Sequence, residues 1–97
     1  MTELQYQALV LVQALLGVIS PNFRMIWITV ESIITIHIVL EIECDDDMEE
    51  IEDLKNEFES LQNGSVAYDI LTIISDSDFD DPEMTNTMIV YRRREIN

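Results

Sequence analysis

Residues 22–43, NFRMIWITVESIITIHIVLEIE, determine how this chain folds. From Ile34 to Glu43 every second residue is isoleucine or leucine, and the residues between them are mostly polar. This period of two predicts a strand with one face in a core, and the many β-branched residues disfavour a helix. Phe23–Val30 is predicted as a partner strand, with a turn at Glu31–Ile33. The centre of the fold is therefore predicted to be a β-hairpin.

Helices are predicted on both sides of the hairpin. Apolar residues recur at helical spacing over residues 2–17, where Thr2 and Gln5 have the spacing of a capping box. After the hairpin, Asp47 and Glu50 have the same spacing and are expected to open a second helix. The apolar stripe of this second helix consists of Met48, Ile51, Leu54, Phe58 and Leu61.

Two further strands are predicted over Val66–Ser75 and Asn86–Arg94, joined by the acidic loop Asp76–Thr85. The third strand is apolar at both alternating sets of positions, so we expect it to be covered on both faces or packed in a homodimer. The prediction is a single domain over residues 1–97. Its class is α+β, a two-layer sandwich of order α-β-β-α-β-β, with a four-stranded, mainly antiparallel sheet and two helices on one face.

The order of the strands stays open at this point. If the last strand lies between the second and the third, the fold is a circular permutation of the ferredoxin-like βαββαβ arrangement. A simpler meander is the alternative. In both arrangements, a crossover through the second helix would place the second and third strands parallel.

Charge is the strongest clue to function. The chain has 20 acidic and 5 basic residues, a formal net charge of −15. Nucleic acid and anionic lipid repel such a chain, so we expect no direct nucleic-acid or membrane partner. Cys44 is the single cysteine, which excludes an internal disulfide and suits the cytoplasm. Glu3, with no Lys or Arg before the apolar run, argues against a signal peptide.

The acidic loop resembles the start of a calcium site but then departs from it. Asp76, Asp78 and Asp80 have the spacing of the first three ligands of a calcium loop. The sixth position is Asp81 where that loop needs glycine, and the twelfth is Thr87 where it needs glutamate. A solvated acidic loop is the favoured interpretation, and no metal or cofactor is expected.

No residue pattern predicts catalysis. His37 is the only histidine, on the polar side of its strand, and Cys44 has acidic neighbours that disfavour a thiolate. The cluster Arg92–Arg94 is expected to pair with acids of the sheet rather than with nucleic acid. Trp27 and Tyr91 are possible interface anchors, although core packing is more typical of aromatic residues in a small sheet. We therefore expect a binding protein rather than an enzyme.

Two acidic blocks, residues 41–59 and 76–83, are the remaining candidates for recognition. Their charge density suggests a surface that is complementary to a basic protein. Whether they lie at the same end of the sheet or at opposite ends is left open. The residues expected to bind a partner are Asp45, Asp46, Glu49, Asp53, Glu57, Asp76, Asp78, Asp80 and Asp81.

Three segments, LLGVISPNFRMIWI (15–28), EIEDLKNEFESLQ (50–62) and MIVYRRRE (88–95), are similar to a group of small bacterial immunity proteins. This group includes the partners of contact-dependent growth inhibition toxins. The resemblance implies a protein that neutralises a cognate toxin C-terminal domain, and many such domains are basic nucleases. It also implies that Ser20–Asn22, Arg24 and Tyr91–Glu95 belong to the scaffold.

The resemblance and the charge together predict an acidic surface that covers the active site of an RNase or tRNase toxin. Binding at an exosite is left open. The alternative is a small acidic structural or dimerisation module with no toxin partner, whose charge serves solubility only.

Overall fold

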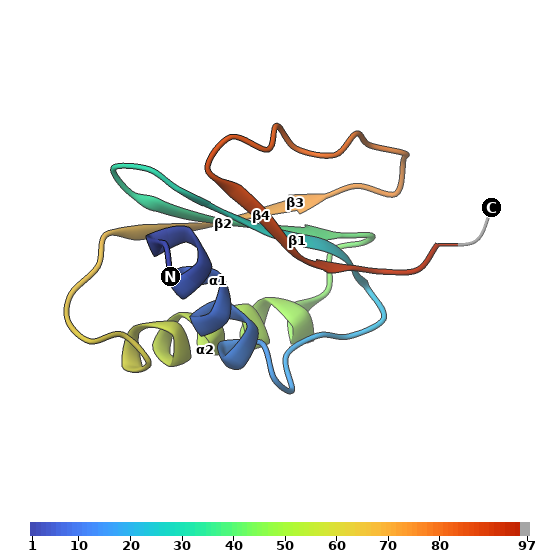
Figure 1. The fold of residues 1–97 in the computed structure, drawn as a ribbon. Coiled ribbons are helices and arrows are strands. Elements are labelled where there is room, and N and C mark those ends of the chain that lie inside the picture. Colours follow the sequence, from blue (N-terminus) through green and yellow to red (C-terminus); the bar gives the residue numbers. More distant parts are fainter. Residues whose placement is uncertain (96–97) are drawn as a thin grey trace.

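The computed structural model describes residues 1–95 and shows two helices packed on one face of a four-stranded sheet (Figure 1). The elements are α1 (Glu3–Ala14), β1 (Phe23–Val30), β2 (Ile34–Leu40), α2 (Asp45–Ser60), β3 (Tyr68–Ile74) and β4 (Thr87–Arg92). The predicted α+β class, element order and two-layer arrangement are confirmed. The predicted domain also included residues 96–97, which lie outside the described residues.

The hairpin forms as its alternation predicts. β1 and β2 pair antiparallel from Phe23 opposite Leu40 to Val30 opposite Ile34. Ile26 and Ile28 of β1 and Ile36 and Ile38 of β2 are fully buried in the core cluster. That cluster also contains Leu11 of α1 and Leu54 and Phe58 of α2, so the helices close the core from one side.

The two helices begin differently. At α1, the Thr2 hydroxyl accepts from the Gln5 backbone N–H, and the Gln5 side chain accepts from the Thr2 N–H, which confirms the predicted capping box. The capping box predicted at Asp47 is wrong, because α2 begins at Asp45 with Cys44 as its N-cap. Asp47 is buried inside the first turn, where its carboxylate accepts a hydrogen bond of 2.9 Å from the Asn22 side chain.

The sheet is mixed, so the prediction of a mainly antiparallel sheet is wrong. Its order is β3-β2-β1-β4, with β2 and β3 parallel and β1 antiparallel to both β2 and β4. Strands β2, β3 and β4 therefore run in one direction. Because β4 pairs with β1 at the edge, neither the permuted ferredoxin-like order nor the meander is found. The parallel pair arises because α2 provides the long crossover that such pairing requires.

The β3–β4 connection, residues 75–86, passes over the sheet face opposite the helices, here called the outer face (Figure 1). β3 lies at one edge of the sheet and β4 at the other, so this loop has to cross the strands between them. Of the two alternatives expected for β3, coverage on both faces within the chain is wrong, and packing in a homodimer stays a prediction. Its residues Leu71, Ile73 and Ile74 are 49%, 41% and 46% exposed.

Candidate functional site

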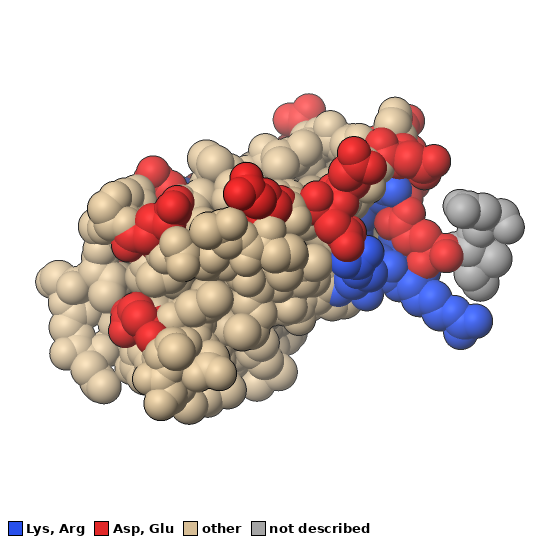
Figure 2. Space-filling model, turned by 45° about the horizontal axis from the view of Figure 1, so that its top comes forward, with Lys and Arg blue, Asp and Glu red and all other residues tan. Residues whose placement is uncertain are grey.

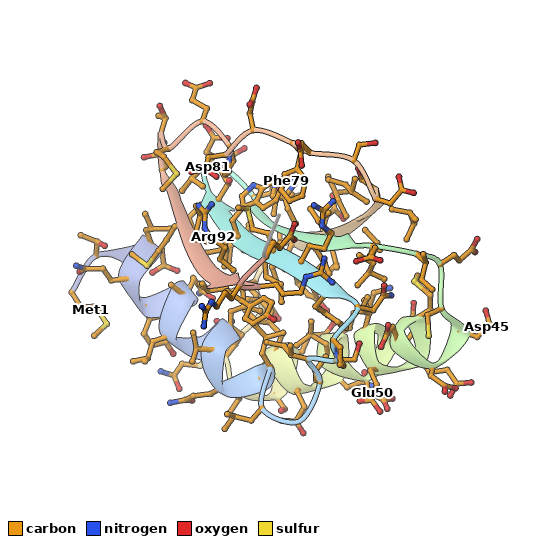
Figure 3. All side chains as sticks on the ribbon, turned by 90° about the vertical axis from the view of Figure 1, so that its right-hand side faces the viewer. Met1, Asp45, Glu50, Phe79, Asp81 and Arg92 are labelled. Carbon is orange, nitrogen blue, oxygen red and sulfur yellow. The ribbon has the colours of Figure 1, made fainter. Side chains whose placement is uncertain are left out.

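The two acidic blocks lie on opposite layers of the molecule. Figure 3 shows Asp45 and Glu50 on α2, and Phe79 and Asp81 on the loop across the sheet. The predicted partner-binding residues are all exposed. The α2 block comprises Asp45, Asp46, Glu49, Asp53 and Glu57, and the loop block comprises Asp76, Asp78, Asp80 and Asp81. The sheet therefore separates the two acidic blocks, whose relative placement the sequence left open.

The blocks approach each other at one end of the sheet. Phe23 pairs with Leu40, and Leu40 pairs with Ile74, so the start of β1 lies beside the ends of β2 and β3. α2 begins shortly after β2 ends, and the acidic loop begins directly after β3. The first residues of each block, Asp45 and Asp76, thus follow neighbouring strand ends.

Arg24 fastens the loop to the sheet. Its Nη1 donates to the carbonyl oxygens of Ser75 (2.8 Å) and Ser77 (2.7 Å), and its guanidinium lies 4.7 Å from the centre of the Phe79 ring. Nε and Nη2 donate to the two carboxylate oxygens of Glu95 at 2.9 and 2.7 Å. We call this group, Arg24 with Ser75, Ser77, Phe79 and Glu95, the Arg24 clasp. Arg24 is only 5% exposed, so its charge is satisfied inside the protein.

The Arg24 clasp shifts the pKa values of Glu95 and Arg24. The hydrogen bonds from Arg24 hold the pKa of Glu95 at about 2, and the same contact raises the pKa of Arg24. Arg93 extends the network, donating to Glu95 at 3.2 Å, to Glu41 at 2.8 Å and to the Pro21 carbonyl at 2.8 Å. The predicted pairing of the arginine cluster with acids of the sheet is confirmed for Arg93.

A second ion pair holds the loop further along. Arg92 Nη2 lies 2.9 Å from Asp81 Oδ1, and the hydrogen bond between them lowers the pKa of Asp81 and raises that of Arg92. Both side chains are more than half exposed, so this pair adds little stability. Because Asp81 already has an internal partner, it is a weaker candidate for recognition than the other loop acids.

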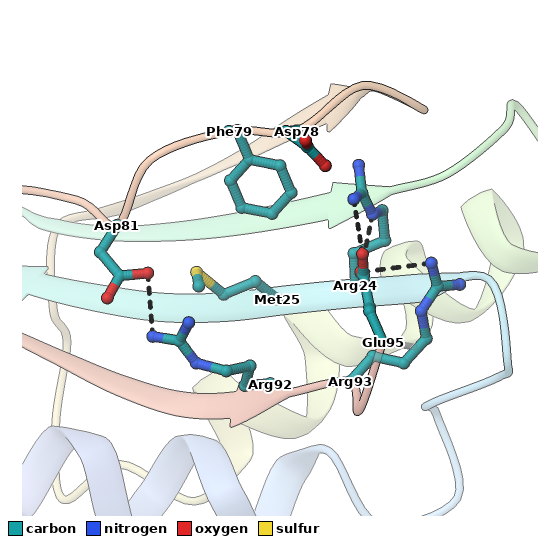
Figure 4. A pocket seen from close by; sticks show the side chains of 8 residues that line it. All are labelled: Arg24, Met25, Asp78, Phe79, Asp81, Arg92, Arg93 and Glu95. Atoms are coloured by element: carbon teal, nitrogen blue, oxygen red, sulfur yellow. Dashed lines mark hydrogen bonds and ion pairs between the residues drawn. The ribbon is translucent and has the colours of Figure 1, made fainter. Parts of the chain in front are cut away.

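A hollow of about 350 Å³ lies between the loop and the sheet (Figure 4). In Figure 4, Phe79 and Met25 face each other across it, with the two ion pairs at its sides. Figure 2 shows acidic side chains gathered around the arginines at this end, next to a broad surface without charge. The residues lining the hollow are Arg24, Met25, Asp78, Phe79, Asp81, Arg92, Arg93 and Glu95.

A row of large side chains crosses the outer face beside the loop. Leu71 pairs with His37, His37 with Trp27, and Trp27 with Ile89, one residue from each strand. The Trp27 and His37 rings are stacked, with centroids 4.7 Å apart and planes 9° from parallel, and burial lowers the pKa of His37. Tyr91 packs against the core as expected. Trp27 instead lies half-buried on the outer face.

Within residues 1–95 no three His, Cys, Asp or Glu side chains are placed to hold a metal ion. Over the same range, neither helix has the length and apolar character needed to cross a membrane. The Arg24–Glu95 contact was missed at the level of sequence because the two residues are 71 positions apart. Two signals were available: an arginine flanked by apolar residues in β1, and the resemblance that placed Arg24 and Glu95 in the scaffold.

A family model described as MafI2 immunity protein matches residues 5–95. The chain belongs to the MafI2 immunity protein family. The match covers almost all of the described fold, including the Arg24 clasp from its first residue to its last. A comparison with curated proteins found no match.

Membership of the MafI2 immunity proteins implies a cognate toxin as partner. The resemblance to toxin-immunity proteins is therefore confirmed at the level of this class. The matched family is MafI2. The narrower prediction, that the chain is an immunity protein of a contact-dependent growth inhibition toxin, stays a prediction. The alternative of an acidic module without a toxin partner is not favoured.

Proposed function

We propose that this immunity protein binds a basic RNase or tRNase toxin domain and covers its active site with the acidic loop, without catalysis of its own. The carrying observation is the Arg24 clasp, which presents Asp76, Asp78 and Asp80 as exposed carboxylates on a fastened loop. A nuclease site that grips phosphates is positively charged, so an array of carboxylates can occupy it in place of RNA. A fastened loop also loses less conformational entropy on binding than a free one.

The α2 acids have a different part in this proposal. The molecule measures 40 × 28 × 18 Å, and the sheet lies between α2 and the loop, so a toxin seated on the loop leaves the part of α2 beyond its first turn uncovered. The charge of α2 still adds to the negative potential that draws a basic toxin towards the chain. Such attraction can raise association rate constants towards ~10⁸–10⁹ M⁻¹s⁻¹ at low salt.

The cytoplasm, where RNA is available to the toxin, is the compartment in which we place this encounter. Delivery of the toxin by contact-dependent growth inhibition stays a prediction. It is checked by mixing toxin-producing cells with target cells that carry or lack this chain, with and without a porous barrier between the two populations.

The test begins with co-expression of the chain with candidate toxin domains and continues with a domain whose lethality the chain suppresses. One variant replaces Asp76, Asp78 and Asp80 of the loop with lysine. The matched control replaces Glu49, Asp53 and Glu57 of α2 with lysine, which changes the net charge by the same amount at positions that are also exposed. Rescue of cells, inhibition of RNA cleavage, and association and dissociation rates at several salt concentrations are measured.

The loop variant is expected to lose inhibition and to dissociate at least about tenfold faster. The α2 variant is expected to associate more slowly at low salt and to keep inhibition at saturating concentration. Loss of inhibition in the α2 variant, with the loop variant unaffected, would overturn the assignment of the loop. A toxin that is neutralised but cleaves no RNA would overturn the nuclease assignment. Competition between the chain and RNA distinguishes occlusion of the active site from binding at an exosite.

A further inference from the structure

The cross-strand row, defined as Leu71, His37, Trp27 and Ile89, forms an apolar strip on the outer face. Side chains of laterally paired residues point to the same side of a sheet, so these four lie next to each other. Leu71 is 49% exposed, and the other three are partly exposed. Because the helices cover the opposite face, no helix of the described chain packs over this strip.

Acidic residues border the row on both sides. Asp69 of β3 is exposed and pairs with Thr35 in the next lateral row, on the same face of the sheet as Leu71. On the other side, Met25 and Arg92 form the row that lies beneath the acidic loop, where Arg92 binds Asp81. The apolar strip therefore lies between Asp69 on one side and the acidic loop on the other, which together are called the acidic rim.

We infer that the cross-strand row is the hydrophobic centre of the toxin interface, and that the toxin places an apolar patch surrounded by basic residues against it. This inference rests on the proposed function. It adds a desolvated apolar contact, which supplies binding energy that charge alone does not. Interface energy concentrates in a few desolvated residues, among which tryptophan is enriched, while a polar rim excludes water. The stacked Trp27–His37 pair has the position of such a centre.

Charge decides which occupant fits this surface. A second copy of the chain would bring another Asp69, another acidic loop and a second net charge of −15 against the same rim. A basic protein meets the rim with complementary charge and can desolvate the row. Burial already disfavours the protonated form of His37, so the stacked pair presents a neutral surface to an apolar patch.

Trp27 offers a direct test because it is the only tryptophan of the chain. Incorporation of 5-fluorotryptophan gives a single ¹⁹F resonance from the row. We expect this resonance to shift on addition of the toxin domain selected by co-expression, and to lose its solvent isotope effect. A complex that forms with the Trp27 resonance unchanged overturns the inference.

Matched substitutions provide the second measurement. Leu71 on the outer face and Leu9 on α1 are both 49% exposed, so Leu71→Gln and Leu9→Gln remove the same apolar group from opposite layers. We expect Leu71→Gln to raise the dissociation rate constant of the complex about tenfold and to leave association nearly unchanged. Leu9→Gln is expected to change neither rate. Ile73→Thr removes an apolar group from the same edge strand and keeps a β-branched side chain there. It provides a second measurement on β3 if Leu71→Gln does not fold.

The outcomes separate the two proposals. If no complex forms with that toxin domain, the proposed function fails and this inference fails with it. If the complex forms and the loop acids matter, but Leu71→Gln behaves like Leu9→Gln, only the inference fails. If the Trp27 resonance shifts with the concentration of the chain in the absence of toxin, the cross-strand row binds a second copy of the chain. That result would also overturn the inference.

Discussion

Replacement of Arg24 by methionine tests the central claim about the loop. The change removes four hydrogen bonds: one each to the carbonyl oxygens of Ser75 and Ser77, and two to Glu95. Hydrogen bonds to a charged group contribute about 1.5–3 kcal/mol each, so the gross loss is at least about 6 kcal/mol. Methionine avoids the cost of burying a charge, which is several kcal/mol, and the released carbonyls become hydrated.

The expected net decrease in the free energy of unfolding is therefore about 2–4 kcal/mol. A domain of this size typically has about 5–15 kcal/mol, so the variant should stay folded. Amide hydrogen exchange should accelerate at residues 75–86, which the clasp holds, and much less in β2, which lies inside the sheet. The dissociation rate of the toxin complex should rise as well, because the acids are no longer presented on a fastened loop.

The assay is equilibrium urea unfolding combined with hydrogen exchange resolved by segment. Arg94→Met is the control, because it changes the charge equally at an exposed residue next to the same network. Arg24→Lys is a second comparison, since a lysine ammonium lacks the planar fork that bonds Glu95 and both carbonyls together. If Arg24→Met matched Arg94→Met in stability and loop exchange, the reasoning about the clasp would be refuted.

Two further predictions concern other parts of the network. The pKa of Glu95 is about 2, below its ordinary value of 4.5, so its contribution to stability is present above pH 4.5 and is lost as the pH falls through 2. The difference in unfolding free energy between the parent chain and Glu95→Gln should shrink over that window, and a constant difference would contradict it. Asp47→Ala should cost about 1–2 kcal/mol more than Asp46→Ala in urea unfolding, because only Asp47 is buried and bonded to Asn22. Equal effects at the two neighbouring acids would show that the Asn22 contact is unimportant.

Local patterns in the sequence predicted the helices and strands well, because each pattern depends only on residues close to one another in the chain. The alternation around Ile36 and Ile38 depends only on one buried face, and the capping box at Thr2 depends on four consecutive residues. The second capping box failed because Asp47 has a tertiary partner, Asn22, which lies 25 positions earlier. A local rule has no access to such a partner.

Strand order and the division of the acids depended on long-range contacts. The position of β4 beside β1 follows from the path of residues 75–86 over the outer face, and Arg24 and Phe79 hold that path. Nothing in the spacing of the loop acids indicates which layer they occupy. The exposure of the residues predicted to bind the toxin could be inferred from their solvated pattern, but their separation by the sheet could not.

The late position of β4 in the chain has a consequence for biosynthesis. The β1–β2 hairpin is local and can form early, whereas the last edge of the sheet and the contact of Arg24 with Glu95 wait for the final segment. Until that segment leaves the ribosome, β1 remains an open edge rich in isoleucine, an arrangement prone to aggregation. A nascent chain stalled before residue 87 would thus lack β4 and the contact of Arg24 with Glu95, and its exposed β1 edge would make it prone to aggregation.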